Sequence, residues 1–131
     1  MVKKSQSAIE FIILVGLMLF LFSSFLFVFQ QNLEKKIEQK RNLEIKDLAL
    51  TIQNEINIAA ETSSGYQRSF SIPEKIIKLD YGISVADGFL YLNTSDSKHA
   101  IGLPIPTVIG EIQKGTNTIT KINSTVYLNT P

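Results

Sequence analysis

Between Phe11 and Phe29 the chain reads FIILVGLMLFLFSSFLFVF, without a single charged side chain. Only Gly16, Ser23 and Ser24 interrupt the apolar run. A helix of this length extends over about 28 Å, which is close to the thickness of the hydrocarbon layer of a bilayer. A helix in the core of a soluble domain would show a polar face, and this segment has none. The segment is therefore predicted to be a membrane-spanning helix.

The flanking charges and the length of the apolar run bear on its orientation and fate. Lys3 and Lys4 precede it and favour a cytoplasmic N-terminus. Five Lys or Arg residues between positions 30 and 50 argue for the opposite orientation, although long domains are translocated largely regardless of charge. A secretory signal peptide would have a shorter apolar region and a small-residue cleavage site after it. The run continues into Gln30-Gln31-Asn32 without such a site, so we expect the helix to be retained.

A short motif before the apolar segment carries a resemblance to a known family. Residues 3–11 read KKSQSAIEF, a basic stub followed by a small residue, Gln, a Ser-containing stretch and Glu. This arrangement resembles the class III signal peptide of archaeal type IV pilins and related filament subunits. The resemblance implies that a prepilin peptidase cleaves the chain between Ser5 and Gln6, on the cytoplasmic side of the membrane. The apolar helix would then stay on the mature protein.

Glu10 lies at the N-terminal edge of the apolar segment. A carboxylate in this position is costly and usually marks a functional group or a partner. After the expected cleavage, Glu10 would be the fifth residue of the mature chain. The resemblance implies that it meets the α-ammonium group of a neighbouring subunit and fixes the axial register between subunits. The alternative is that Glu10 lies at the membrane interface, hydrated by headgroup water.

Beyond Phe29 the pattern becomes amphipathic, and the helix is predicted to continue to residue 61. No proline precedes Pro73 and no glycine lies between Gly16 and Gly65, so nothing breaks it. An apolar stripe with three- and four-residue spacing consists of Leu33, Ile37, Ile45, Leu48, Ile52, Ile56 and Ala59. Leu43 and Leu50 lie on roughly the opposite side, so the helix is expected to contact both its own C-terminal region and another subunit. A dimeric coiled coil is the alternative, but the sequence lacks sustained heptads.

The segment 81–92 is the clearest strand signal in the C-terminal region. Asp87-Gly88 predicts a two-residue turn between two antiparallel strands. The predicted register pairs Val85 with Leu90 and Ile83 with Leu92 on one apolar face. It places the pairs Ser84–Tyr91 and Ala86–Phe89 on the other face.

Further strands are predicted on both sides of this hairpin. Residues 66–72 form one candidate, ended by Pro73. Residues 107–113 and 116–128 are predicted to form a second hairpin around Lys114-Gly115, and residues 104–106 to form an extended loop. About four to five strands packed against the helix would complete a core.

The composition argues against several classes of function. Thirteen basic and 12 acidic residues give a net charge of +1, so no nucleic acid partner is expected. The chain has no cysteine and one histidine, His99, which argues against disulfides, thiolate chemistry and a histidine metal site. Asp96-Ser97-Lys98-His99 is interpreted as a polar loop and not as a catalytic group. No enzyme activity, metal or cofactor is predicted.

Two N-glycosylation acceptor motifs occur in the polar C-terminal region. They are Asn93-Thr94-Ser95 and Asn123-Ser124-Thr125. Archaeal filament subunits, which the N-terminal motif resembles, are often N-glycosylated. Asn93 and Asn123 are therefore predicted acceptors.

Together these observations predict an α+β protein with a long N-terminal helix packed against a small antiparallel β-sheet, a pilin-like plan. Its predicted parts are a cleaved leader (1–5), a transmembrane and filament-core helix (6–29), an amphipathic continuation (30–62) and a β-rich extracellular region (63–131). The predicted function is a structural subunit of a type IV pilus-like cell-surface filament. Copies of this chain would leave the cell membrane to form a homo-oligomeric helical filament, whose role in adhesion, motility, uptake or secretion stays open. The alternative is an unassembled single-pass membrane protein with a small extracellular binding domain.

Overall fold

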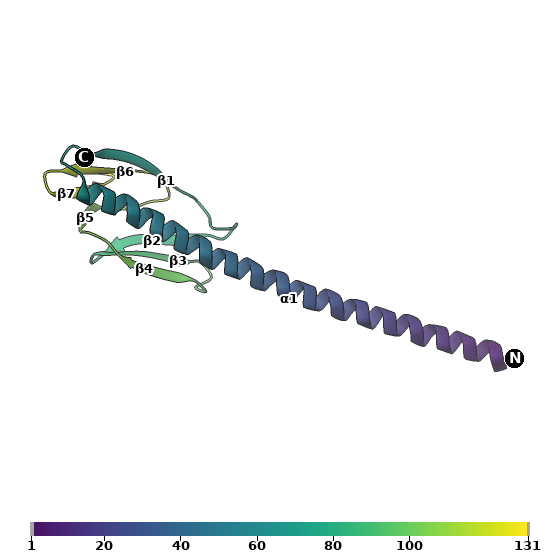
Figure 1. Cartoon of the computed structure of the whole chain (residues 1–131). Helices are drawn as coiled ribbons and strands as arrows, with labels where there is room; N and C mark the ends of the chain where they lie inside the picture. Colours follow the sequence, from purple (N-terminus) through teal and green to yellow (C-terminus); the bar gives the residue numbers. More distant parts are fainter. Residues whose placement is uncertain (1, 131) are drawn as a thin grey trace. The chain divides into compact units, whose positions relative to one another are not determined.

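The computed structural model describes residues 2–130, which form one long helix followed by β-strands (Figure 1). Helix α1 extends from Val2 to Glu61. The strands are β1 (Gln67–Ile72), β2 (Tyr81–Ala86), β3 (Phe89–Thr94), β4 (Ala100–Pro104), β5 (Val108–Gly110), β6 (Gly115–Ile122) and β7 (Thr125–Leu128). The protein is therefore α+β, as predicted, and the helix ends at the expected residue.

The chain divides into two compact units, with the boundary between Gln39 and Lys40. The first unit contains the N-terminal part of α1. The second unit, which we call the head, comprises residues 40–130: the C-terminal part of α1 and all seven strands.

The strands of the head form two sheets. The four-stranded sheet has the order β1-β6-β7-β5, and the three-stranded sheet has the order β2-β3-β4. The β2–β3 hairpin has the predicted register, with Val85 opposite Leu90 and Ile83 opposite Leu92. Asp87 and Gly88 have φ values of 52° and 78°, which is the conformation that a two-residue hairpin turn requires. The Asp-Gly signal is thus confirmed.

The second predicted hairpin is wrong. Gly115 begins β6 opposite Ile72 of β1, so β6 lies between β1 and β7 and does not pair with the segment before it. The actual hairpin joins β6 to β7 through Asn123, whose φ is 56°. Strand β5 pairs with β7 in parallel, so this sheet is mixed and not purely antiparallel. Seven strands form, more than the sequence predicted, and β4 had given no clear signal.

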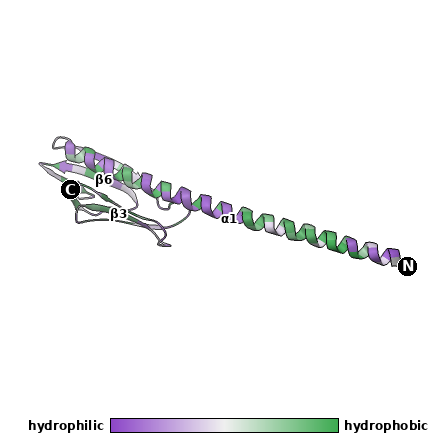
Figure 2. Cartoon of the chain, turned by 60° about the horizontal axis from the view of Figure 1, so that its bottom comes forward, coloured by the Kyte–Doolittle hydropathy of each residue, from purple (hydrophilic) through white to green (hydrophobic). Residues whose placement is uncertain are grey.

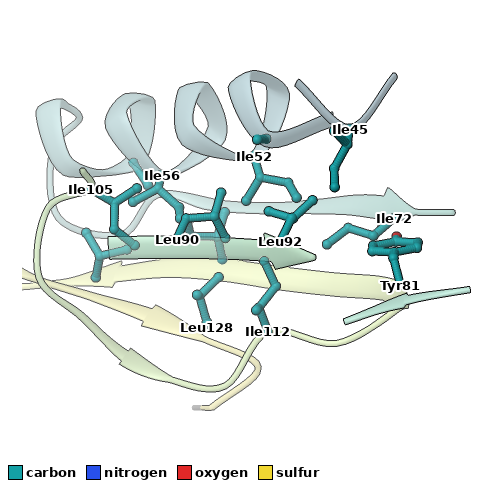
Figure 3. Close-up of a cluster of buried hydrophobic side chains, with 14 of the residues drawn as sticks. Ile45, Ile52, Ile56, Ile72, Tyr81, Leu90, Leu92, Ile105, Ile112 and Leu128 are labelled. Carbon is teal, nitrogen blue, oxygen red and sulfur yellow. The ribbon is translucent and has the colours of Figure 1, made fainter. Parts of the chain in front are cut away.

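One face of the C-terminal part of α1 forms the core of the head. Its buried residues are Ile45, Ala49, Ile52, Ile56 and Ala59. Figure 3 shows Ile52 and Ile56 facing Leu90 and Leu92 of β3, with Leu128 of β7 beyond them. Each aliphatic side chain buried in this way contributes roughly 1.5–3 kcal/mol. The predicted stripe is correct within the head.

The same stripe is only partly correct along the whole helix. Leu33 and Ile37 are exposed, and they belong to the first unit, whose described residues are all helical. Leu48 is half-buried at the edge of the core. Ala49 is fully buried but was not predicted, because its small side chain adds little to the apolar pattern.

Polar contacts attach the strands to α1 around this core. Glu55 and Arg68 of β1 form an ion pair with a separation of 3.3 Å. The side-chain amide of Gln53 donates to the Pro104 carbonyl at 2.7 Å. The Lys121 ammonium donates to the Ala60 carbonyl in the last turn, where a cation also stabilises the helix dipole. Both sheets are therefore fixed to the same helix.

A strained turn precedes β2. Ile76 and Leu79 exchange backbone hydrogen bonds of 2.8 and 2.9 Å around Ile77 and Lys78. Ile77 and Lys78 have φ values of 43° and 62°, a region that L-residues other than Asn and Asp rarely adopt. The Lys78 side chain is exposed, so its backbone conformation carries a cost without a packing gain.

Replacing Lys78 with glycine should therefore stabilise the head. We expect Lys78→Gly to raise the free energy of unfolding by about 0.5–1 kcal/mol, because glycine adopts a positive φ without steric cost. Near-UV circular dichroism of the detergent-solubilised chain during urea unfolding would measure the change. Lys75→Gly is the matched control, since Lys75 is exposed and is not among the residues with positive φ. Equal effects of the two variants would contradict this account.

Candidate functional site

The N-terminal part of α1 has apolar side chains on all sides. Its large hydrophobic residues from Ile9 to Phe29 are between 37% and 68% exposed. In Figure 2 they form a hydrophobic stretch of the helix, and the helix then becomes mixed toward the head. By length and composition α1 can cross a membrane, and the described residues contain one such helix. An apolar surface on every side is compatible with association with a membrane.

The few polar or small residues in this stretch do not interrupt the helix. The Ser24 hydroxyl donates to the Phe20 carbonyl at 2.8 Å, so this polar group is satisfied within the helix. The rings of Phe25 and Phe29 stack with their centroids 6.2 Å apart. Apart from its chain neighbours and the adjacent helix backbone, no atom of the described residues lies within 4 Å of where a Cβ of Gly16 would be, so packing within the described chain does not require glycine there.

The residues of the leader motif lie within α1. Ser5, Gln6 and Glu10 are exposed and helical. The Gln6 side-chain amide donates to the Glu10 carboxylate at 3.3 Å, one helical turn away. A neutral amide compensates the negative charge of a carboxylate less well than a cationic group would. The negative charge of Glu10 therefore remains available to a cationic partner.

The part of α1 within the head has a second apolar face. Leu43, Leu50 and Ile58 are exposed, opposite to the buried stripe. The prediction for Leu43 and Leu50 is thus confirmed in position. Ile58 was not predicted, although its spacing of eight residues from Leu50 places it on the same side of the helix.

The two predicted glycosylation acceptors lie in different sheets. Asn93 is exposed in β3, the central strand of the three-stranded sheet. Asn123 is exposed at the turn between β6 and β7, and its N–H donates to the Ser64 hydroxyl at 2.8 Å. Both belong to the head, whereas the leader motif belongs to the first unit.

The loop after Asn93 is held by a buried threonine. Thr94 is fully buried, and its hydroxyl donates to Asp96 Oδ1 at 2.6 Å and accepts the His99 N–H at 3.1 Å. The hydrogen bond from the Thr94 hydroxyl, with that from the Lys98 N–H, holds the pKa of Asp96 below its usual value. Thr94 and Asp96 thus use their polar groups to shape the turn.

A second electrostatic cluster lies at the start of β2. The Lys114 ammonium pairs with Asp80 and lies 4.7 Å from the centroid of the Tyr81 ring. The Lys114 hydrogen bond and the Tyr81 N–H hold the pKa of Asp80 below its usual value. Burial raises the pKa of Tyr81 to about 12, and its hydroxyl donates to the Pro73 carbonyl. The cluster links the β5–β6 loop to β2.

Two amide side chains, the buried Asn117 and the exposed Asn129, stabilise the C-terminal strands and were not predicted from the sequence. Asn117 is fully buried, donates to the Gln113 carbonyl at 2.6 Å and accepts the Gln113 N–H at 3.0 Å. Asn129 donates to Asn117 Oδ1 at 2.7 Å. The sequence contained one signal for the burial of Asn117. It lies two residues before Ile119, so both side chains are on the same face of β6.

Two shallow clefts lie beside β2. The larger, of about 370 Å³, lies between the β2–β3 turn and β5, and the smaller, of about 270 Å³, includes Ile112. Their linings contain one carboxylate each, Asp87 and Glu111 respectively. Among residues 2–130, no three His, Cys, Asp or Glu side chains are grouped so that they could hold a metal ion.

Comparison of the chain with protein-family models, with curated proteins and with solved structures found no significant match.

The stability of the head should depend on Asp80 and Asp96. A carboxyl group whose pKa is lower in the folded than in the unfolded state stabilises the fold above its unfolded pKa of about 3.9. This contribution is lost as the pH falls through the folded pKa. We expect the thermal midpoint of the head to decrease between about pH 5 and pH 3. The fall should be smaller in the double variant Asp80→Asn/Asp96→Asn, measured by circular dichroism, and an unchanged pH dependence would contradict the assignment.

Proposed function

We propose that this protein is a structural subunit of a type IV pilus-like filament on the cell surface. The observation that carries the proposal is the apolar surface around α1 from residue 11 to residue 29, with Glu10 at its edge. This surface is unburied within the described chain, so it needs either lipid or other proteins around it. A filament supplies both in turn, because the helix is first in the membrane and then among copies of itself.

Processing at the leader would connect the two states. A prepilin peptidase would cleave between Ser5 and Gln6 and leave the apolar helix on the mature protein. The cleavage would remove Lys3 and Lys4, which favour retention of the N-terminus at the cytoplasmic face. It would also create an α-ammonium group on Gln6, one helical turn from Glu10.

Glu10 would then fix the axial register between subunits. Its present partner is the neutral Gln6 amide at 3.3 Å, and a subunit that enters the filament would offer the α-ammonium of its own Gln6. In an apolar bundle this ion pair would offset the cost of a buried carboxylate only at the correct axial offset. Leu43, Leu50 and Ile58 would provide further apolar contact between neighbouring heads.

The proposal places the head outside the cell, where the two acceptor motifs would meet the glycosylation machinery. Asn93 and Asn123 are both exposed, as a modified side chain must be. Modification of these residues is a part of the proposal that filament assembly does not require.

The N-terminal sequence of the protein purified from native membranes and from sheared surface material tests the processing step. We expect the chain to begin at Gln6, because the motif KKSQSAIEF has the order of a prepilin cleavage site. Ser5→Asp should prevent cleavage and leave the full-length precursor in the membrane. A native chain that still carries residues 1–5 would overturn the filament proposal and favour the unassembled membrane-anchored protein.

Glu10→Gln tests the assembly step separately. We expect normal membrane insertion but at least a tenfold lower filament yield, since the loss of about 1.4 kcal/mol per contact already corresponds to a factor of ten. Sheared filaments and the membrane fraction would be quantified by immunoblot. Glu34→Gln is the matched control, because Glu34 is an exposed carboxylate on the same helix beyond the apolar segment. The same filament yield in both variants would remove Glu10 from the mechanism.

A further inference from the structure

The outer face of the three-stranded sheet is uncharged and has two aromatic residues on its central strand. Its three cross-strand rows are Ala86-Phe89-Pro104, Ser84-Tyr91-Gly102 and Gly82-Asn93-Ala100. Leu90 and Leu92 alternate with the central residues and are buried on the inner face. Phe89 and Tyr91 are 42% and 43% exposed, so both aromatic residues are in contact with solvent. This exposure is a cost that a suitably placed neighbour would remove.

The central residues of the three rows follow one another along β3. The rings of Phe89 and Tyr91 have their centroids 6.0 Å apart. Asn93 is the next residue on this face, about 7 Å further along the strand. Phe89 thus flanks the Tyr91 ring on one side, and a group attached to Asn93 would flank it on the other.

Two glycines make space for these side chains. A Cβ on Gly102 would lie 3.3 Å from two carbons of the Tyr91 ring, so this ring lies close over the backbone of β4. A Cβ on Gly82 would lie 2.8 Å from Asn93 Oδ1, so the amide lies close over β2. The neighbours of Tyr91 and Asn93 in their cross-strand rows are glycine, serine or alanine, so no large side chain stands beside either of them. The Tyr91 ring itself occupies the space over Gly102, and the Asn93 amide occupies the space over Gly82.

Asn93 is also the acceptor of the motif Asn93-Thr94-Ser95. The hydroxyl that the motif requires belongs to Ser95, which is exposed, while Thr94 is buried in the turn. The acceptor motif and the exposed rings of Phe89 and Tyr91 are independent observations, because neither feature requires the other. Their coincidence on one strand face is the basis of the inference.

We propose that Asn93 carries an N-linked saccharide whose first sugar packs against the exposed ring of Tyr91. The bond forms between Asn93 Nδ2 and C1 of a saccharide delivered on a lipid diphosphate. The bond between C1 and the phosphate oxygen breaks, the lipid diphosphate leaves with the bonding electrons, and Nδ2 loses one proton. The inference rests on export of the head in the proposed function, but not on filament assembly.

The sugar fits this place by its chemistry. The C–H groups of a pyranose ring make one of its faces apolar, and that face can cover an aromatic ring while the hydroxyls remain in water. The covalent link holds the sugar close to the ring, so packing costs little additional entropy. The face has no charged side chain that would have to lose its hydration. The packing should therefore stabilise the head.

Asn123 provides a natural comparison within the same chain. It lies at a hairpin turn with a φ of 56°, and the residue two positions before it is Lys121. The Lys121 ammonium already donates to the Ala60 carbonyl. A saccharide at Asn123 would therefore extend into solvent without an aromatic ring at the equivalent position.

The test uses the full chain produced in its native cells. Glycopeptide mass spectrometry should find a saccharide on Asn93, and an unmodified Asn93 would overturn the proposal. The thermal midpoint of the head, followed by limited proteolysis of the detergent-solubilised protein, is then compared in a double-mutant cycle. Ser95→Ala removes the acceptor motif but keeps the Ser95 N–H, which donates to the Asp80 carbonyl. Tyr91→Thr removes the ring and keeps a good strand residue.

We expect Ser95→Ala to lower the midpoint by about 4 °C when Tyr91 is present and by less than about 1 °C when Thr replaces it. Asn123→Asp, which tolerates the positive φ, should shift the midpoint by less than about 1 °C in the Tyr91 chain. Equal effects of Ser95→Ala with and without the ring would overturn the contact even if Asn93 is modified. A mature N-terminus at Gln6 tests the filament proposal independently, so the two proposals can fail separately.

Discussion

The fold of the head depends on one buried face of α1. The two sheets are separate hydrogen-bonded units in the described chain, so no ladder of backbone hydrogen bonds joins them. Ile45, Ile52 and Ile56 share a single core with Leu90 and Leu92 of one sheet and Leu128 of the other. Hydrophobic burial against the helix, supported by the contacts of Gln53 and Glu55, therefore holds the sheets in one domain. A strand arrangement of this kind would not bury its inner faces without the helix.

The surface of α1 differs between its two parts. From residue 40 it is amphipathic, and its own strands cover one face. From residue 11 to 29 it is apolar on every side, and its side chains are exposed within residues 2–130. Polar or charged substitutions in the first unit would therefore change its preference for lipid or for other helices, whereas those on the buried face would unfold the head. Glu10 is a charged residue directly before this apolar segment.

The sequence predicted those parts of the structure that depend on local patterns. The period of the apolar residues gave α1 and most of its buried stripe, and Asp87-Gly88 gave the β2–β3 hairpin with its register. The order β1-β6-β7-β5 could not be predicted, because Gly115 opposite Ile72 and the parallel pairing of β5 with β7 are contacts between distant segments. Of the candidate site, Gln6 and Glu10 are neighbours as a helix requires. The position of Phe89 and Tyr91 on one face followed from the predicted register. The position of Asn93 on the same face, and the glycines beneath Tyr91 and Asn93, became apparent only with three strands in place.

The absence of a break in α1 has a mechanical consequence. Backbone hydrogen bonds continue from the apolar segment into the core of the head, since the helix is assigned without interruption from Val2 to Glu61. Tension applied to the N-terminal part would therefore be carried along the helix backbone to Ile45, Ile52 and Ile56. The helix would have to slide along both sheets at once, which loads many side-chain contacts in shear together. A pull along the helix would therefore be resisted by contacts to both sheets at the same time.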